Sequence, residues 1–364
     1  MLTGARRCGK STLQGQLSRQ SDSSAVFCNL EDTRLYGMEP RDFPSLLSLL
    51  DENYPGAAVF LDEVQEVAEW QRLVRALLDA GRRVCVTGSN ASLLGRELGA
   101  KLTGRHLSVA VYPFSYGEYL ELRGSQRGEE TLHGYLAEGG FPAALREPDL
   151  APVLLRELLR DVVQRDIVSR FGLRDTRHLM NLALHLMAHT GQPLSLQSLA
   201  KGLGIPSVAQ TGRYLEYLRD AWLILPVPRF SSSFKKRVIS PPKYYAIDPG
   251  FRVANTPNPT PDVGRRLENA VLLALLRAGE EVAFAAETHR WECDFLTSKA
   301  AIQVCANLSP QNREREVRGL LGAATLPSSG RHARELLILS IDQRDAFTED
   351  GRGIKVLPAW EWLD

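Results

Sequence analysis

Short apolar runs alternate with helical patterns along the first third of the chain. Runs rich in β-branched and aromatic residues occur at 25–30, 57–61, 84–86 and 107–111. Apolar residues recur every three or four positions, as on one face of a helix, at 43–50, 70–78 and 93–98. Buried strands that alternate with helices form parallel sheets. The pattern therefore predicts an α/β fold with a doubly wound parallel sheet in residues 1–125.

The pattern changes after residue 125 and predicts three further parts. Residues 126–175 are predicted to form a helical lid or connector. Residues 176–256 are predicted to form a winged helix-turn-helix, with helices at 195–204 and 206–223 and a β-hairpin of 223–230 with 244–247. After a linker rich in Pro, Asn and Thr, residues 263–364 are predicted to form a small α/β domain, with a helix at 267–276 and strands at 282–285, 293–297 and 301–305.

A phosphate-binding loop opens the chain. Its residues fit the pattern G-x-x-x-x-G-K-[ST] and are Gly4, Ala5, Arg6, Arg7, Cys8, Gly9, Lys10 and Ser11, followed by Thr12. In such a loop the backbone N–H groups cradle phosphates, the Lys reaches the β and γ oxygens, and the Ser hydroxyl binds Mg²⁺. Only three residues precede the loop as a strand. Either the sheet tolerates a short strand, or the recorded start lies downstream of the natural one.

A second motif completes the predicted nucleotide site. An apolar strand ends in Asp62 and Glu63. We expect the carboxylate of Asp62 to lie beside Mg²⁺ and that of Glu63 to polarise the attacking water. The alternative is an ordinary strand capped by two solvated acids. Together with the loop, the motif predicts binding of ATP and Mg²⁺.

The next apolar run ends in small polar residues. Thr87 and Ser89 are predicted to touch the γ-phosphate or its water. The alternative is a turn whose residues cap the short helix that follows. The two interpretations stay open at this point.

The overall composition is that of an ordinary globular protein. The chain has 364 residues, of which 44% are hydrophobic and 24% charged, and a formal net charge of +1. This balance excludes a general polyanion binder, so any nucleic-acid contact requires a local basic patch. The sequence has neither an apolar run long enough for a membrane nor a secretory signal. Five cysteines without a C-x-x-C pair predict reduced thiols in the cytoplasm, and Cys8 is expected to be inert.

Several segments together resemble one family. In the first third they are Gly4–Ser11, Phe60–Gln65, Val86–Ser89, Gly104–Arg105 and Tyr112–Tyr119. Later segments are Gly139–Pro142, Asp248–Gly250, Leu267–Val271 and Ile302–Cys305. The chain resembles bacterial and archaeal AAA-type ATPases whose C-terminal region is a domain of unknown function. Members carry a longer segment before the loop, so the resemblance implies a truncated or misassigned start.

The resemblance also implies a role for Arg105. AAA-type ATPases carry an arginine at this place that reaches the nucleotide of a neighbouring subunit, which implies a homo-oligomer. Such an arginine contributes roughly 10³–10⁵ in rate where it has been tested. The alternative is an ordinary surface arginine.

The predicted wing carries a run of cations without an acid. The cations are Arg229, Lys235, Lys236, Arg237 and Lys243. Such a loop suits a phosphate backbone, so we expect DNA as a partner. The alternative is a solvated wing that packs on the ATPase, because AAA-type proteins also use winged helices for protein contacts.

The last part resembles the restriction-endonuclease-like core. In that core a helix Glu, a strand Asp and an E-x-K strand assemble a Mg²⁺ site. Glu268 and Asp294 match, whereas Gln303 and Cys305 stand in the E-x-K positions. An amide is a poor Mg²⁺ ligand and a thiol cannot replace an ammonium group, so we expect no nuclease chemistry. The alternative is that Glu287 or Glu292, which lie nearby in sequence, migrates into the site.

Three hypotheses follow. The first is a cytoplasmic AAA-type ATPase that hydrolyses ATP to remodel or move on DNA, without a membrane partner. The second is a nucleotide-gated switch that binds DNA or protein and turns over slowly. The third is an ATP-coupled nuclease.

Overall fold

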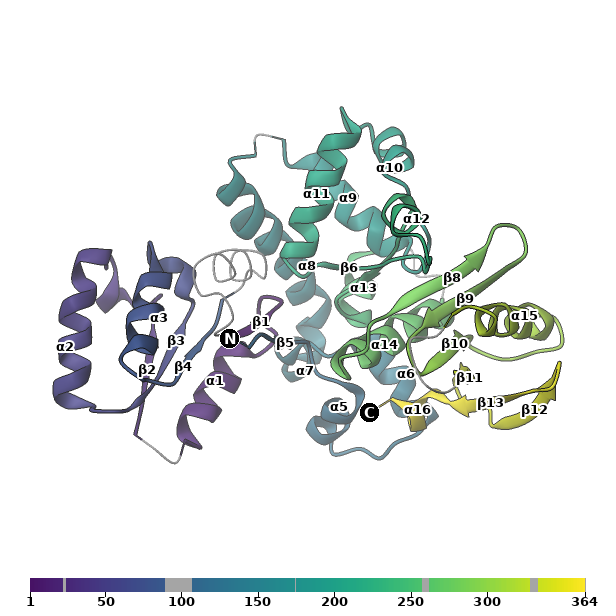
Figure 1. Cartoon of the computed structure of the whole chain (residues 1–364), viewed down its shortest axis with the longest axis horizontal. Helices are drawn as coiled ribbons and strands as arrows, with labels where there is room; N and C mark the ends of the chain where they lie inside the picture. The colour runs from purple at the N-terminus through teal and green to yellow at the C-terminus, as the bar shows by residue number, and fades with distance from the viewer. Residues whose placement is uncertain (22–23, 89–106, 174, 257–261, 328–332, 364) are drawn as a thin grey trace. The chain divides into compact units, whose positions relative to one another are not determined.

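The structure is a computed structural model that describes residues 1–21, 24–88, 107–173, 175–256, 262–327 and 333–363 (Figure 1). The chain divides into two compact units. The first unit comprises Met1–Val111 with Asp220–Trp222, and the second comprises Tyr112–Arg219 with Leu223–Asp364. None of the helices within the described ranges is long and apolar enough to cross a membrane. The predicted subdivision of residues 112–364 into lid, winged helix and end domain stays a prediction.

A parallel sheet forms the centre of the first unit. Its elements are β1 (Leu2–Gly4), α1 (Lys10–Arg19), β2 (Ala25–Asn29), α2 (Phe43–Asn53), β3 (Ala58–Asp62), α3 (Trp70–Asp79), β4 (Val84–Val86) and β5 (Val109–Val111). Parallel pairing joins β2 to β3, β3 to β4 and β1 to β5. A parallel bridge between Leu2 and Thr87 joins these groups, which gives the order β2-β3-β4-β1-β5. The predicted parallel α/β sheet is confirmed, whereas the predicted helix at 93–98 lies outside the described residues.

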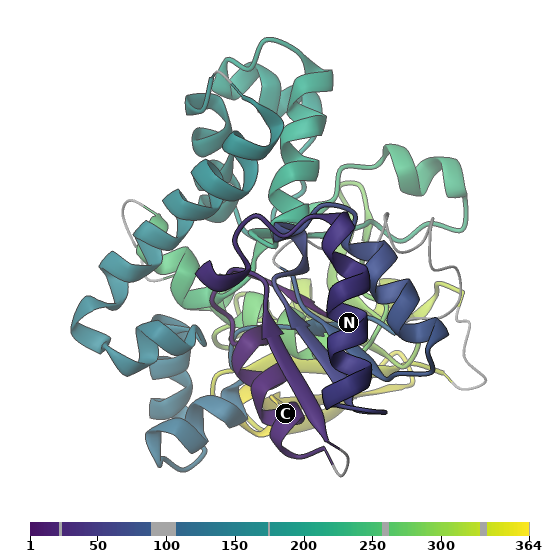
Figure 2. The ribbon, with the colours of Figure 1, turned by 90° about the vertical axis from the view of Figure 1, so that its left-hand side faces the viewer.

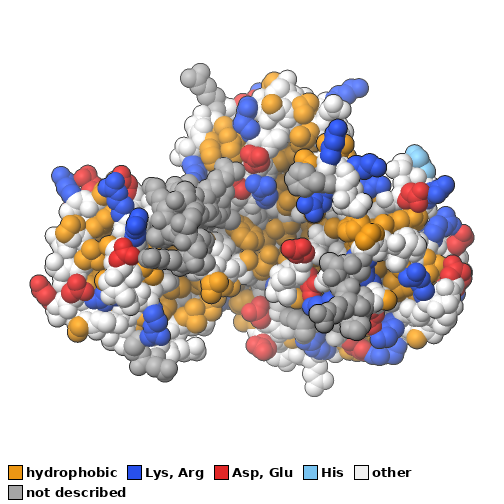
Figure 3. All heavy atoms as spheres, viewed as in Figure 1, with side chains coloured by type: hydrophobic (Ala, Val, Ile, Leu, Met, Phe, Trp, Pro, Cys, Tyr) orange, Lys and Arg blue, Asp and Glu red, His pale blue; other side chains and the backbone are white. Residues whose placement is uncertain are grey.

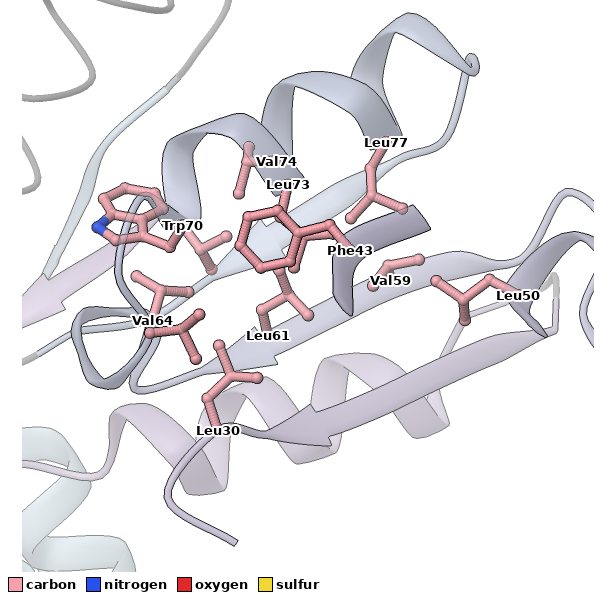
Figure 4. Close-up of a cluster of buried hydrophobic side chains, with 12 residues drawn as sticks. Leu30, Phe43, Leu50, Val59, Leu61, Val64, Trp70, Leu73, Val74 and Leu77 are labelled. Atoms are coloured by element: carbon pink, nitrogen blue, oxygen red, sulfur yellow. The ribbon is translucent and has the colours of Figure 1, made fainter. Parts of the chain in front are cut away.

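The hydrophobic core of the first unit lies against one face of this sheet (Figure 4). Leu73 and Leu77 of α3 pack with Val59 and Leu61 of β3, and all four side chains are buried. Every residue of β3 is buried, as expected for an interior strand of a parallel sheet. The core therefore fixes β3, whose carboxyl end carries Asp62.

The second unit begins with helices and a small hairpin. Its helices here are α5 (Tyr116–Arg123), α6 (Glu129–Glu138), α7 (Pro142–Arg146), α8 (Ala151–Asp161), a π-helical continuation (Val162–Ser169), α9 (Arg177–Ala188), α10 (Leu196–Leu203), α11 (Val208–Asp220), α12 (Phe234–Ile239) and α13 (Pro249–Asn255). Ser195 caps α10 by accepting a hydrogen bond from Ser198 N–H. The strands β6 (Ile224–Val227) and β7 (Lys243–Ala246) pair antiparallel. The predicted helices and hairpin are thus present, with α12 as an insertion between the two strands.

A mixed sheet forms the rest of the second unit. Its elements are α14 (Val263–Arg277), β8 (Ala283–Glu287), β9 (Trp291–Leu296), β10 (Ala300–Val304), α15 (Arg313–Ala324), β11 (Glu335–Ser340), β12 (Asp345–Glu349), β13 (Arg352–Pro358) and α16 (Ala359–Trp362). The strand order is β12-β13-β11-β10-β9-β8. Only the β10–β11 and β11–β13 pairs are parallel. Val317 and Leu320 of α15 pack on Ala301 and Cys305, which anchors this helix to the sheet.

Candidate functional site

The loop between β1 and α1 has the backbone of a phosphate cradle. Gly9 at the start of α1 has φ of 104°, and Gly4 has φ of 155°. A Cβ atom at Gly4 would collide with the carbonyl oxygen of Val111. Both positions therefore require glycine, Gly9 for its left-handed conformation and Gly4 for the close approach of β5.

Lys10 is held by the loop itself. Its side chain is buried, and Nζ donates to the carbonyl oxygens of Gly4 at 3.2 Å and Ala5 at 2.8 Å. The ammonium group thus lies inside the loop whose N–H groups would face the phosphates. This position fits the predicted role of Lys10 as the loop cation.

Asp62 is the centre of a hydrogen-bonded group at the carboxyl ends of the strands. Ser11 Oγ donates to Asp62 Oδ1 at 3.1 Å, and Thr87 Oγ1 donates to the same oxygen. Asp62 and Thr87 are almost completely buried. The structure therefore brings together the loop serine, the strand aspartate and one of the two predicted polar residues after β4.

Glu63 lies next to this group. Its backbone is left-handed, with φ of 52°, and its N–H donates to Thr87 Oγ1 at 3.1 Å. Gln65 Nε2 donates to Glu63 Oε2 at 2.5 Å, while the buried Oε1 atom of Gln65 has no hydrogen-bond partner among the described residues. Glu63 is thus held beside Asp62 by Thr87 on the backbone side and by Gln65 on the carboxylate side.

Further carboxylates gather at this edge of the sheet. Burial, and after it the charges of Glu63 and Glu66, raise the pKa of Glu31. The local negative charge favours a cation such as Mg²⁺ at this edge.

Sequence reasoning missed Gln14 and Gln65. Gln14 is fully buried, and its Nε2 donates to the carbonyl oxygens of Leu61 at 3.1 Å and Cys85 at 3.0 Å, which ties α1 to β3 and β4. A polar residue at the fourth position after the loop lysine, on the side of the helix that faces the sheet, was the available signal. For Gln65 the signal was its position two residues after Glu63.

The remaining predicted loop residues have different exposures. Arg6 is partly buried, whereas Arg7 and Thr12 are exposed. Cys8 is buried and its Sγ donates to Val111 O at 3.2 Å. Burial raises the pKa of the Cys8 thiol, which fits the expectation of an inert residue. Ser89 and Arg105 lie outside the described residues, so their predicted roles stay predictions.

The predicted DNA-contacting cations do not form one surface. Lys243 is only 1% exposed. Its Nζ lies 2.8 Å from Glu292 Oε1, 3.1 Å from Asp294 Oδ1 and 3.4 Å from Glu268 Oε1. The prediction that Lys243 contacts a phosphate backbone is wrong, because the hairpin strand β7 is interior rather than a solvated edge.

Three cations of the predicted set are exposed. Arg229 is partly buried, and its Nη2 donates to the carbonyl oxygen of Ala286 at 2.5 Å. Lys235, Lys236 and Arg237 of α12 are exposed. Figure 2 shows this short helix standing out from its own unit, and Figure 3 shows Lys and Arg side chains in the region of α12. The exposed cations of the predicted set therefore all lie on α12.

The residues expected at a nuclease-like centre do come together. Glu268 on α14 and Asp294 on β9 both contact the ammonium group of Lys243. Gln303 on β10 accepts a hydrogen bond from Asp294 N–H at 2.8 Å and donates to Glu292 O at 3.0 Å. Burial raises the pKa of the Cys305 thiol to about 12. Sequence reasoning missed the lysine, because it comes from the hairpin and not from the E-x-K strand.

Comparison with known proteins bears on both units. Residues 1–120 match the family model described as "AAA domain". The first unit is similar to an AAA-type P-loop domain. Residues 129–262 match a model described as a domain of unknown function. Together with the parallel sheet, the match of residues 1–120 supports a resemblance to AAA-type P-loop ATPases. Neither family model covers residues 263–364.

Relatives extend over more of the chain. An uncharacterized protein of Methanocaldococcus jannaschii is 29% identical, over 100% of this chain and 87% of its own length. An uncharacterized protein of Haemophilus influenzae is 29% identical, over 82% of this chain and 79% of its own length. Among solved structures, Cdc6p from Pyrobaculum aerophilum covers 62% of this chain and 80% of its own, with 14% identity and a TM-score of 0.28. This score is too low to carry an argument.

Proposed function

We propose that the first unit binds ATP with Mg²⁺ and hydrolyses it, and that turnover serves to remodel or move on DNA. The hydrogen-bonded group of Ser11, Asp62 and Thr87 beside the phosphate loop is the observation that carries the proposal. Hydroxyl and carboxylate oxygens are the ligands that Mg²⁺ prefers, and they lie next to the loop that would hold the phosphates. Ser11 and Asp62 therefore fit a bound Mg²⁺ ion.

Each side chain has a separate task in this proposal. Ser11 would ligate Mg²⁺, and Asp62 would orient Ser11 and the metal. When bound, Mg²⁺ would neutralise phosphate charge. Glu63 would accept a proton from the attacking water, and its hydrogen bond from Gln65 fixes the direction of its carboxylate. The predicted finger Arg105 would add charge stabilisation from a neighbouring subunit.

The decisive experiment replaces Glu63 by Gln in the full chain. We expect ATP binding to persist and kcat to fall by about 10²–10⁴, because an amide cannot accept the proton of water. Glu69→Gln is the matched control, since this exposed carboxylate follows the same turn and is paired with Arg72. Binding is measured with a fluorescent ATP analogue and turnover by phosphate release. Turnover by Glu63→Gln at the parental rate would show that Glu63 is not the base.

The proposed DNA contact is made by α12 as the tip of a winged helix. Residues 229–243 contain no acid. Three neighbouring cations of α12 are exposed, and so are Val238 at 65% and Ile239 at 69%. Cations beside exposed aliphatic side chains suit a phosphate backbone with an adjacent base step. This combination favours a wing that contacts DNA over a wing that only packs on protein.

The test of this contact is the salt dependence of binding. Replacing Lys235, Lys236 and Arg237 with Ala should weaken binding to all sequences and reduce the slope of log affinity against log salt by up to about three. The control removes three cations of the same unit that are paired with acids, namely Arg313, Arg318 and Lys355. An unchanged slope in the α12 variant, or an equal change in the control, would contradict the contact.

A further inference from the structure

We propose that the ammonium group of Lys243 is the resident cation of a carboxylate cluster formed by Glu268, Glu292 and Asp294, in the place where a nuclease-like core would hold a divalent metal ion. The three ion pairs of Lys243, between 2.8 and 3.4 Å, converge on one atom. They connect β7 of the hairpin with α14 and β9. The proposal is independent of the ATPase and concerns the second unit alone.

The residues present do not fit a divalent metal ion. Asp294 uses Oδ1 for Lys243 and Oδ2 for the N–H of Val304 at 3.0 Å. Glu268 Oε1 accepts from both Lys243 and the Tyr245 hydroxyl, the latter at 2.6 Å. Mg²⁺ needs near-octahedral oxygen ligands, whereas these oxygens already accept protein hydrogen bonds. Within the described ranges no group of three His, Cys, Asp or Glu residues is arranged to hold a metal.

Gln303 cannot supply the missing ligand. Its Oε1 accepts from Asp294 N–H and its Nε2 donates to the backbone oxygens of Glu292 and Glu316. The amide therefore links β10 to β9 and α15, and its oxygen is directed at the backbone. A glutamate at this position would lack the two donated hydrogen bonds, so the amide suits a core without a metal.

The surroundings keep Lys243 charged. Burial alone would lower its pKa, but the charges of Asp294, Glu268 and Glu292 raise it above the ordinary value. Nζ also lies 5.4 Å from the ring centre of Phe284 on β8, which adds a cation–π contact. Because the ammonium group belongs to the chain, it does not dissociate from the cluster as a metal ion would. Lys243 therefore holds β7, at the base of the hairpin that carries α12, without any metal.

The first test removes the ammonium group and leaves the carboxylates. Mn²⁺ is titrated into the nucleotide-free full chain and free Mn²⁺ is measured by electron paramagnetic resonance. In the parent protein we expect no Mn²⁺ site that depends on the carboxylate of Asp294. Lys243→Ala should gain one site, at least about tenfold tighter than any in the parent, and Lys243→Ala with Asp294→Asn should lose it. Lys355→Ala is the control, because it removes a lysine of the same unit from an exposed ion pair.

Two results would overturn the proposal. One is an Asp294-dependent Mn²⁺ site in the parent, because a metal would then already share the cluster with Lys243. The other is a folded Lys243→Ala variant without a new site, because the carboxylates would then not form a cation site at all.

A second measurement on the parent protein does not depend on the folding of a variant. Lysines are acylated in the native chain and located by mass spectrometry. Lys299, whose side chain is 79% exposed, should react fully under conditions that leave Lys243 unmodified, with or without Mn²⁺. Reaction of Lys243 within about tenfold of Lys299, or its appearance when Mn²⁺ is added, would contradict a resident ammonium group.

Discussion

Thr87→Val tests whether the buried hydroxyl at the end of β4 holds the two acidic residues of the site. Valine has nearly the same shape as threonine but cannot make the hydrogen bonds to Asp62 Oδ1 and from Glu63 N–H. A hydrogen bond to a charged partner contributes about 1.5–3 kcal/mol and a neutral one about 1 kcal/mol. The substitution should therefore lower the free energy of opening β3 by about 2.5–4 kcal/mol.

Hydrogen exchange of β3 peptides measures this opening directly. Because 1.4 kcal/mol is a factor of ten, exchange of Ala58–Asp62 should be about 60 to 700 times faster in Thr87→Val. Thr87→Ser is the control, since it keeps the hydroxyl and loses only a methyl group worth about 1 kcal/mol. We also expect kcat for ATP to fall in the valine variant and not in the serine variant. Equal exchange in the two variants would refute the reasoning.

Three other predictions concern the loop, a buried acid and the end of the chain. Lys10→Ala should abolish tight ATP binding, because the loop loses the cation that Gly4 and Ala5 hold; unchanged affinity of a fluorescent analogue would contradict this. Burial raises the pKa of Asp248 to about 6, so between about pH 4 and 6 the folded state holds a proton that the unfolded state releases. The contribution of Asp248 to the free energy of unfolding should therefore fall by about 3 kcal/mol as the pH rises through this window. Urea titrations should show this fall as a change in the difference between the parent and Asp248→Asn, because the other carboxyl groups titrate in both proteins. The chain should not cleave plasmid or branched DNA with Mg²⁺ or Mn²⁺, and nicking that vanished in Asp294→Ala would overturn that expectation.

The candidate nucleotide site was largely accessible from the sequence because its parts are local. A loop that begins after a strand and leads into a helix has a backbone set by its own glycines, so Gly4, Gly9 and Lys10 are where the pattern puts them. The two acids follow an apolar run, and parallel strands bring their carboxyl ends to one edge. The contact of Thr87 with Asp62 also follows from the pairing of neighbouring strands. The hydrogen bond from Gln65 to Glu63 depends instead on the turn after β3.

What the sequence by itself determined is therefore the order of strands and helices and the chemistry of contiguous motifs. Periodicity and spacing report on residues that are close in the chain. Only the tertiary structure determines whether Lys243 faces water or carboxylates, because its neighbours in sequence are the same in both cases. Its partners Glu268 and Asp294 lie on a later helix and strand, and only the packing of β7 against them made the lysine buried and paired. A lysine in a basic loop is ordinarily solvated, and only long-range charges can offset the cost of burying it.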